Sequence, residues 1–359
     1  MRYRLLGASG LRVSRLFLGA MTFADGFAHG ADTQESRRIV DAYADAGGNV
    51  VDTAVNYRGG ASEEILGEVL KGRRDRFVLC TKYGVTRDPT DPNAAGSHRK
   101  NLRLSLETSL RRLRTDHVDV HYVHLWDPRT ALEETMRALD DAVRAGKILH
   151  LGVSDTPAWV VAQANTDAGW RGRSPFVVLQ ARYGLLSRDA ERDLIPAAEA
   201  LGMSVAAWSP LGGGVLTGRF TRDGGPGEPT RVAPGSISDR DLAIARTAAA
   251  VADDLGLTTA QVALAWTTAR YRAVHPILGA RRVDQLHDTL AAADLTLPPD
   301  AVARLDAASA IELGFPHDFL RQEPMPKALV YGDRWREVDD RRFTVRRAPA
   351  DDVAVLGRS

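Results

Sequence analysis

The sequence predicts a single-domain α/β protein, a (β/α)8 TIM barrel. Eight short apolar runs recur along the chain, and amphipathic helical segments separate them. The runs are apolar at nearly every position, which is typical of parallel strands buried on both faces. The Gly-x-Gly-x-x-Gly pattern of many open doubly wound sheets is absent after the first run. A closed barrel is therefore favoured over an open sheet.

The first half of the chain supplies five of the eight strands. We expect these strands at residues 16–20, 49–53, 77–82, 118–124 and 148–154. Helices are expected between them at residues 32–46, 62–72, 97–114 and 131–146. Asp32 and Glu35 have the spacing of a capping box, and Ser62 and Ser97 are suitable residues to open the next two helices.

The second half of the chain continues the alternation. Strands are expected at residues 176–180, 203–208 and 274–278, and helices at 156–168, 189–201, 239–255, 258–270 and 282–293. The Gly/Pro-rich stretch 209–238 is too long for an ordinary barrel connection and indicates a lid, a binding loop or disorder. The barrel is expected to span residues 1–310. Residues 311–359 form a C-terminal segment that could fold over the active-site face.

Composition excludes several classes of partner. The 47 Lys and Arg residues balance 46 Asp and Glu, so there is no general attraction to nucleic acid or to an anionic membrane. No apolar run approaches the roughly 20 residues that span a bilayer, and the N-terminus lacks the apolar segment of a signal peptide. Cys80 is the only cysteine and is expected to be a buried thiol. These features predict a cytoplasmic location.

Four polar side chains follow successive strands of the predicted barrel. Asp52 ends the second strand, Tyr57 lies in the loop after it, Lys82 ends the third strand, and His124 ends the fourth. Active sites of α/β barrels lie at the carboxyl ends of the strands, where neighbouring strands are about 4.8 Å apart. Each residue alone has an ordinary structural interpretation. Together they predict one pocket that holds an acid, a phenol, an amine and an imidazole.

This set of groups suits the reduction of a carbonyl group. Hydride addition to the carbon leaves negative charge on the oxygen, which must then receive a proton. A tyrosine can supply that proton, and a nearby ammonium stabilises the phenolate that remains. Lys82 would take this role with Asp52 holding it charged, and His124 would hydrogen-bond the carbonyl oxygen.

The segments around these residues resemble a known family. VVDTAVNY (50–57), TKYG (81–84) and HYVHLWD (121–127) resemble the catalytic tetrad of the aldo-keto reductase superfamily. Further resemblance at 5–23, 152–155, 208–219 and 276–290 extends it over residues 3–310. By this match the tetrad is Asp52, Tyr57, Lys82 and His124. The match implies an NADPH-dependent oxidoreductase that reduces an aldehyde or ketone, with Tyr57 as the proton donor.

The resemblance also implies a binding site for NADPH. Trp208 would stack on the nicotinamide, glycines 212–214 would approach the pyrophosphate, and Arg281 and Arg282 would bind the 2′-phosphate beside a helix N-terminus. The residues implied to bind the cofactor are Gly19, Met21, Thr22, Asp52, Ser154, Asp155, Gln180, Trp208, Ser209, Leu211, Gly213, Gly279, Arg281, Gln285 and Asp288.

Three positions depart from the family pattern. Asp155 replaces the usual Asn, and an ionised Asp accepts hydrogen bonds but cannot donate them. Thr289 replaces an Asn near the adenine, and Arg182 stands where Glu is common. None of the three belongs to the tetrad. Each bears on how tightly the cofactor is bound.

The substrate and two other functions are left open. Phe23, Tyr57, His124 and Trp126 are expected to contact the substrate in a partly aromatic pocket, which many carbonyl compounds would fit. An NADPH-binding regulatory subunit similar to potassium-channel β-subunits is the main alternative. A metal-dependent barrel hydrolase is disfavoured because strand alternation puts His121 and His124 on opposite faces, and no metal is expected. Oligomeric state is not indicated.

Overall fold

The computed structural model describes residues 1–26, 30–221, 232–271, 273–322 and 325–337. The chain divides into two compact units, Met1–Ile311 and Glu312–Ser359. Each unit is described by itself below. Within the described residues, no helix is both long enough and apolar enough to cross a membrane.

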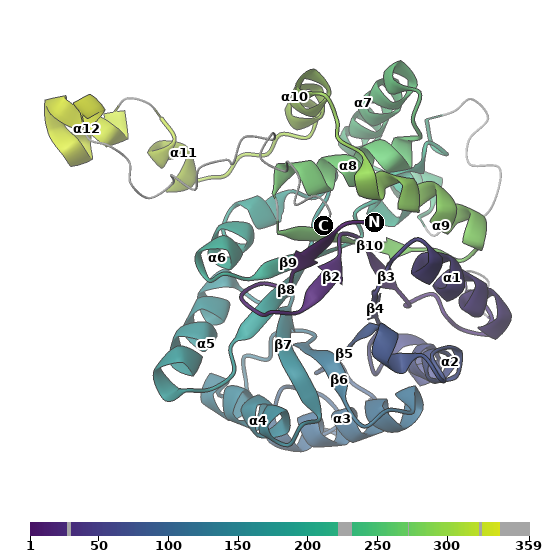
Figure 1. Cartoon of the computed structure of the whole chain (residues 1–359). Helices are drawn as coiled ribbons and strands as arrows, with labels where there is room; N and C mark the ends of the chain where they lie inside the picture. Colours follow the sequence, from purple (N-terminus) through teal and green to yellow (C-terminus); the bar gives the residue numbers. More distant parts are fainter. Residues whose placement is uncertain (27–29, 222–231, 272, 323–324, 338–359) are drawn as a thin grey trace, which may run out of the picture. The chain divides into compact units, whose positions relative to one another are not determined.

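Eight parallel strands of the first unit form a closed barrel (Figure 1). The strands follow the chain in order, and the last one pairs with the first to close the ring. They are β3 (Phe17–Gly19), β4 (Val50–Asp52), β5 (Val78–Tyr83), β6 (Val118–Val123), β7 (Ile148–Ser154), β8 (Phe176–Arg182), β9 (Ser204–Trp208) and β10 (Val274–Gly279). The (β/α)8 barrel predicted from the sequence is confirmed.

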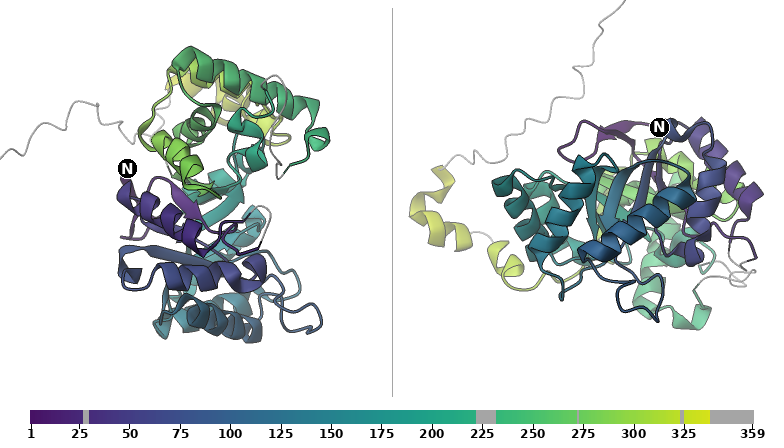
Figure 2. Two further views of the ribbon diagram at one scale, coloured as in Figure 1. Left: turned by 90° about the vertical axis from the view of Figure 1, so that its right-hand side faces the viewer. Right: turned by 90° about the horizontal axis from the view of Figure 1, so that it is seen from below.

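Helices surround the barrel on its outer side (Figure 2). They are α1 (Thr33–Asp45), α2 (Ala61–Val69), α3 (Arg99–Leu113), α4 (Leu132–Arg144), α5 (Ala158–Arg171), α6 (Leu194–Ala200), α7 (Asp239–Leu255), α8 (Thr259–Arg270), α9 (Val283–Leu290) and α10 (Pro299–Ala308). Each predicted helix is present. The segment 189–201 is divided into a 3₁₀ turn, η3 (Asp189–Glu191), and α6.

Some predicted helix starts were wrong. Asp32 does cap α1, since its side chain accepts a hydrogen bond from the Glu35 backbone nitrogen. Ser97 does not cap α3: His98 takes that position, and its ring nitrogen accepts a hydrogen bond from the Asn101 backbone nitrogen. Ser62 lies inside α2 and donates its hydroxyl to a backbone carbonyl of the loop after β3. The Ser62 hydroxyl therefore binds a group outside its own helix.

Two short strands and one helix of the first unit were not predicted. Strands β1 (Tyr3–Leu5) and β2 (Arg12–Ser14) pair as an antiparallel hairpin. Leu6 and Val13 of this hairpin are buried in the cluster that fills the barrel interior. Helix α10 follows the last barrel helix. β1 and β2 have three residues each and contain the arginines Arg4 and Arg12, so they lack the continuous apolar run by which the equally short β3 and β4 were predicted.

The core has two layers separated by the barrel wall. An inner cluster holds alternate strand residues such as Val120 and Tyr122, and an outer cluster lies between the strands and the helices. His121 belongs to the outer side, where its ring stacks on Tyr83 at 5.3 Å between centroids. This alternation follows from the two-residue period of a strand.

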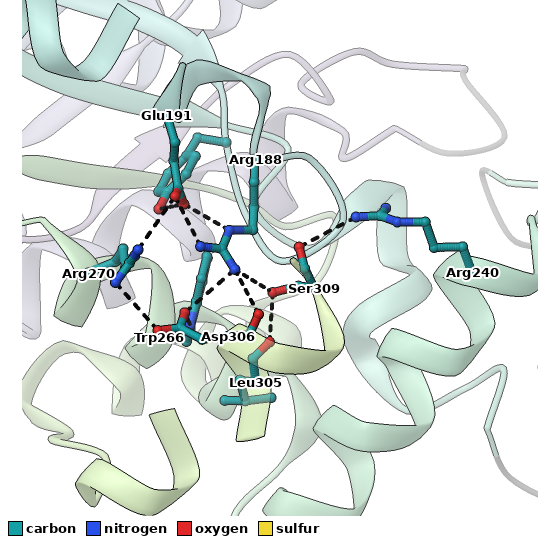
Figure 3. Close-up of polar contacts among 9 residues, drawn as sticks. Arg188, Glu191, Arg240, Trp266, Arg270, Leu305, Asp306 and Ser309 are labelled. Atoms are coloured by element: carbon teal, nitrogen blue, oxygen red, sulfur yellow. Dashed lines mark hydrogen bonds and ion pairs between the residues drawn. The ribbon is translucent and has the colours of Figure 1, made fainter. Parts of the chain in front are cut away.

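A buried ionic cluster joins η3 to α8 and α10 (Figure 3). Arg188 donates two hydrogen bonds to Glu191, of 2.9 and 3.0 Å, and a further one to Ser309 Oγ at 3.0 Å. Its guanidinium lies 5.2 Å from the centre of the Trp266 ring. A bidentate Arg–carboxylate pair of this kind fixes geometry as well as charge. The cluster holds the end of α10 against the barrel.

The long stretch 209–238 contains two short 3₁₀ segments, η4 (Gly212–Thr217) and η5 (Pro234–Ser236), and residues 222–231 lie outside the described part. The second unit contains α11 (His317–Leu320), α12 (Met325–Tyr331) and the 3₁₀ segment η7 (Gly332–Glu337). Within it, the rings of Phe315 and Phe319 lie 6.3 Å apart. Residues 338–359 are outside the described part.

Candidate active site

The structure brings the four residues of the predicted tetrad together. Asp52 is the last residue of β4, Lys82 lies near the end of β5, and His124 directly follows β6. Tyr57 begins a 3₁₀ turn, η1 (Tyr57–Gly60), in the loop after β4. The Lys82 ammonium lies 2.6 Å from Asp52 Oδ2 and 3.2 Å from the Tyr57 hydroxyl, and the Tyr57 and His124 rings are 5.7 Å apart.

Lys82 is a fully buried ammonium with three acceptors. It donates to Asp52, to the Tyr57 hydroxyl and to the backbone carbonyl of Thr53 at 2.7 Å. Burial opposes the charged form, but the charges of Asp52 and Tyr57 and their hydrogen bonds outweigh it and raise the pKa of Lys82. The side chain therefore stays charged and directs positive charge at the phenol oxygen.

His124 faces Tyr57 edge-on, with an angle of 79° between the two rings. Burial, with a smaller effect of the Lys82 charge, lowers the pKa of His124 to about 3. The imidazole is therefore neutral near pH 7. Its Nδ1 has no hydrogen-bond partner among the described residues. A neutral ring can hydrogen-bond a substrate oxygen without adding a second cation beside Lys82.

Gln180 has a contact that sequence reasoning did not anticipate. The resemblance implied only cofactor binding for this residue of β8. Its side-chain nitrogen lies 3.1 Å from Asp52 Oδ1, across the barrel from β4. Asp52 thus receives hydrogen bonds on both oxygens, from Lys82 and from Gln180. This arrangement fixes the plane of the carboxylate that holds Lys82.

Trp208 and Asp155 lie at the ends of β9 and β7. The indole Nε1 of Trp208 donates to Asp155 Oδ1 at 3.1 Å, and the Arg182 guanidinium lies 5.8 Å from the centre of the Trp208 ring. Asp155 and Ser209 have left-handed backbones, with φ of 41° and 55°. Partial burial raises the pKa of Asp155, against the opposing effects of the Trp208 hydrogen bond and the Lys82 charge. Ser154, which ends β7, is buried.

The loop after β3 is joined to two other loops. Gly19 ends β3, and the Thr22 hydroxyl donates to the Ala280 carbonyl at 2.9 Å. Arg58 donates to the Met21 carbonyl at 3.1 Å. Phe23 is fully buried and belongs to the outer core cluster. The expected substrate contact of Phe23 therefore does not agree with its place in the structure.

The glycine loop after β9 has the geometry expected for close approach to a ligand. Gly212, Gly213 and Gly214 have φ of 58°, 70° and 107°, values that side chains rarely permit. A side chain at Gly212 would also approach the Leu186 side chain to 2.4 Å. Leu211 and Gly213, both implied to bind the cofactor, belong to this loop.

The segment expected to bind the adenosine phosphate already has polar partners of its own. Gln285 accepts from the Arg281 backbone nitrogen at 3.2 Å, and Arg282 pairs with Asp284 at 3.2 Å. The first nitrogen of α9 donates to Glu35 Oε1 at 2.7 Å. Asp288 accepts from α8 residues, including Gln261 at 2.9 Å. Sequence reasoning missed Glu35 because it assigned this residue to a local capping box.

An aromatic pair lies beside the catalytic end of β6. Trp126 is 37% exposed, and its ring meets that of Trp159 at 5.9 Å and 84°. Trp159, 62% exposed, is the second residue of α5 and was not identified from the sequence. The Trp126 backbone nitrogen lies 3.5 Å from the Asp155 carbonyl. Inspecting the loop after β7 for aromatic residues would have found Trp159.

These residues fit a nicotinamide dinucleotide. Trp208 offers a partly exposed ring beside the tetrad, the glycine loop leaves room for a pyrophosphate, and Gly279 at the end of β10 has open space where a side chain would be. Arg281 and Arg282 follow Gly279 directly. The ring of Trp208 suits a nicotinamide, the glycine loop suits a pyrophosphate, and the two guanidinium groups suit a phosphate.

Comparisons with known proteins agree with this site. The Aldo/keto reductase family matches residues 15–310. A putative aryl-alcohol dehydrogenase of Saccharomyces cerevisiae is 34% identical, covering 90% of both chains. A norsolorinic acid reductase of Aspergillus flavus is 37% identical over 90% of this chain and 84% of its own. An NADP(+) aryl-alcohol dehydrogenase of Phanerodontia chrysosporium is 34% identical over 93% of this chain and 94% of its own. The chain therefore belongs to the aldo/keto reductase family, whose members are oxidoreductases that act on carbonyl groups with a nicotinamide cofactor.

Proposed function

We propose that this protein is an NADPH-dependent reductase of aldehydes or ketones with Tyr57 as its proton donor. The observation that carries the proposal is the position of Lys82. Its buried ammonium contacts both Asp52, at 2.6 Å, and the Tyr57 hydroxyl, at 3.2 Å. A purely structural ion pair would need Asp52 but would not require a phenol at the barrel mouth.

Each side chain of the site has its own role in the proposed reduction. When bound, the nicotinamide cofactor supplies a hydride to the carbonyl carbon. Tyr57 donates its hydroxyl proton to the carbonyl oxygen, and Lys82 stabilises the phenolate that is left. Neutral His124 hydrogen-bonds the same oxygen and fixes its direction. Asp52 holds Lys82 in place, and Gln180 in turn orients the Asp52 carboxylate.

NADPH is proposed as the cofactor because of the two arginines after β10. Trp208, Asp155, Ser154 and the glycine loop would hold the nicotinamide and the pyrophosphate. Arg281 and Arg282 would bind the 2′-phosphate, with Arg282 exchanging its exposed partner Asp284 for it. An exposed ion pair contributes little, about 0–1 kcal/mol, so this exchange costs little. One relative is named as an NADP(+) enzyme, which supports the same choice.

Aromatic carbonyl compounds are the proposed substrates. Trp126, two residues after His124 in the chain, and Trp159 present an exposed edge-on pair of indoles that would form an aromatic wall. Offset or edge-on aromatic contacts add about 0.5–1.5 kcal/mol to the burial of apolar surface. Relatives named as aryl-alcohol dehydrogenases and as norsolorinic acid reductases support this preference.

The test is multiple-turnover reduction by the purified protein, followed by NADPH absorbance. The substrate panel pairs substituted benzaldehydes and aryl ketones with aliphatic aldehydes of equal carbon number. We expect higher kcat/KM for the aromatic members. NADPH binding without turnover of any member would instead support a regulatory subunit. Activity that needs no NADPH and is lost with a chelator would support a metal-dependent hydrolase.

A further inference from the structure

The loop that carries Tyr57 has an unusual backbone. Three consecutive residues after Tyr57 have left-handed φ values: Arg58 at 54°, Gly59 at 67° and Gly60 at 106°. A non-glycine residue in this region costs of order 1–3 kcal/mol, and such a conformation persists only where the surroundings enforce it. Something outside the loop must therefore hold it.

Arg112 of α3 contacts this loop on both sides of Tyr57. Its Nη1 donates to the Val55 carbonyl at 2.8 Å, and its Nη2 donates to the Gly59 carbonyl at 3.3 Å. The loop wraps so closely around the guanidinium that a side chain at Gly60 would lie 2.1 Å from its central carbon. One planar group thus bridges the residues two before and two after Tyr57.

Glu63 holds the guanidinium from the other side. This carboxylate of α2 has no exposed surface, and its Oε2 lies 3.5 Å from Arg112 Nη1. Its Oε1 accepts from Thr81 Oγ1 at 2.7 Å, and Thr81 directly precedes Lys82 on β5. Burial raises the pKa of Glu63, although the hydrogen bonds and the Arg112 charge oppose this. The network therefore runs from the strand of Lys82 through Glu63 and Arg112 to the loop of Tyr57.

We propose that Arg112 is a positioning residue that sets the distance from Tyr57 to Lys82. This inference rests on the proton-donor role proposed above for Tyr57. Two other bonds tie the loop to the barrel: Val55 donates to the Lys82 carbonyl at 3.2 Å, and Arg58 donates to the Met21 carbonyl at 3.1 Å. Arg112 adds the restraint that spans Tyr57 from both sides. Lysine cannot replace it, because only the guanidinium has a rigid fork that reaches two carbonyls at once.

The experiment replaces Arg112 and measures kcat, KM and NADPH affinity with a benzaldehyde substrate. We expect Arg112→Ala to lower kcat roughly 10- to 100-fold, since a misplacement of about 1 Å can cost 10²-fold. NADPH affinity, followed by tryptophan fluorescence, changes less than about twofold. Added guanidinium at non-denaturing concentrations restores part of kcat by filling the vacated site. Arg111→Ala, an exposed neighbour on the same helix, is the matched control and leaves kcat unchanged.

Two further variants keep the test decisive. If Arg112→Ala does not fold, Arg112→Lys keeps the charge and the stem, and we expect it to lose kcat without loss of NADPH binding. In the double variant Arg112→Ala/Tyr57→Phe, the two losses do not multiply, because both act on one proton transfer. Multiplying losses, or a folded Arg112 variant with wild-type kcat, would overturn the inference.

The failure of the inference differs from the failure of the proposed function. If Tyr57→Phe keeps wild-type kcat, the proton-donor assignment is wrong, whatever Arg112 does. If Tyr57→Phe removes turnover and Arg112→Ala does not, the assignment stands and the positioning role is wrong.

Discussion

The indole nitrogen of Trp208 donates a 3.1 Å hydrogen bond to Oδ1 of Asp155. Trp208 ends β9 and Asp155 directly follows β7, and the backbone of Asp155 also contacts that of Trp126. The proposed nicotinamide plate and the proposed substrate wall are therefore connected through one residue. That residue, Asp155, is one of the three positions at which the sequence departs from the pattern that it otherwise resembles.

Asp155→Asn is expected to preserve or tighten NADPH affinity. The amide oxygen can still accept from Trp208, and the amide nitrogen adds the donor that an ionised carboxylate lacks. The substitution also removes a negative charge from a site for an anionic cofactor. The measurement is NADPH titration by quenching of tryptophan fluorescence, with Asp253→Asn as an exposed control. A large loss of affinity would mean that the carboxylate has a role of its own.

Tyr57→Phe is expected to lower kcat by about 10²- to 10⁴-fold, the usual contribution of a general acid. Cofactor affinity stays within about twofold, because the ring and its contacts remain. Steady-state kinetics and fluorescence titration measure the two quantities separately. Tyr3→Phe, which loses a surface hydrogen bond to Gly47, is the control and keeps full activity. Wild-type kcat in Tyr57→Phe would exclude Tyr57 as the donor.

Replacing Arg281 and Arg282 together by Ala is expected to raise KM for NADPH at least about tenfold. Charge-assisted hydrogen bonds to a phosphate are worth about 1.5–3 kcal/mol, and NADH has no 2′-phosphate to lose them. The ratio of KM values for the two cofactors is the measurement. Arg304→Ala, which removes a surface charge paired with Asp254, should leave that ratio unchanged. Equal effects on both cofactors would show that the arginines do not bind the 2′-phosphate.

His121 is expected to make the protein less stable in acid. Burial lowers its pKa to about 3 in the folded state, and neither ring nitrogen has a partner among the described residues. An unfolded histidine has a pKa of about 6.5, so between these values the unfolded state binds the extra proton. The free energy of unfolding contributed by neutral His121 is present above pH 6.5 and is lost as the pH falls toward 3.

His121→Phe tests this expectation because it keeps a flat ring against Tyr83. The drop in Tm between about pH 7.5 and pH 5.0 should be smaller in this variant than in the wild type. It should not vanish, because burial also lowers the pKa of His275 to about 4. Leu106→Met, a core change without a titratable group, should lower Tm equally at both values. An unchanged drop in His121→Phe would contradict the assignment.

The sequence by itself determined the barrel and the meeting of four polar side chains at one end of it. Eight apolar runs separated by helical segments leave few other closed arrangements. A parallel barrel then places every strand end at one face, so Asp52, Lys82 and His124 had to be neighbours once the strands were correctly assigned. Strands and helices could be predicted because their hydrophobic patterns repeat over a few neighbouring residues.

Only the tertiary structure decided the contacts between distant elements. Gln180 meets Asp52 across the barrel, Glu35 binds the first nitrogen of α9, and Arg112 bridges two carbonyls of the Tyr57 loop. Phe23 is likewise buried in the outer core, and Trp159 lies against Trp126. Each of these polar groups had several suitable partners in the chain, and the sequence does not show which of them it contacts. That choice is settled by packing in three dimensions and leaves no period in the sequence.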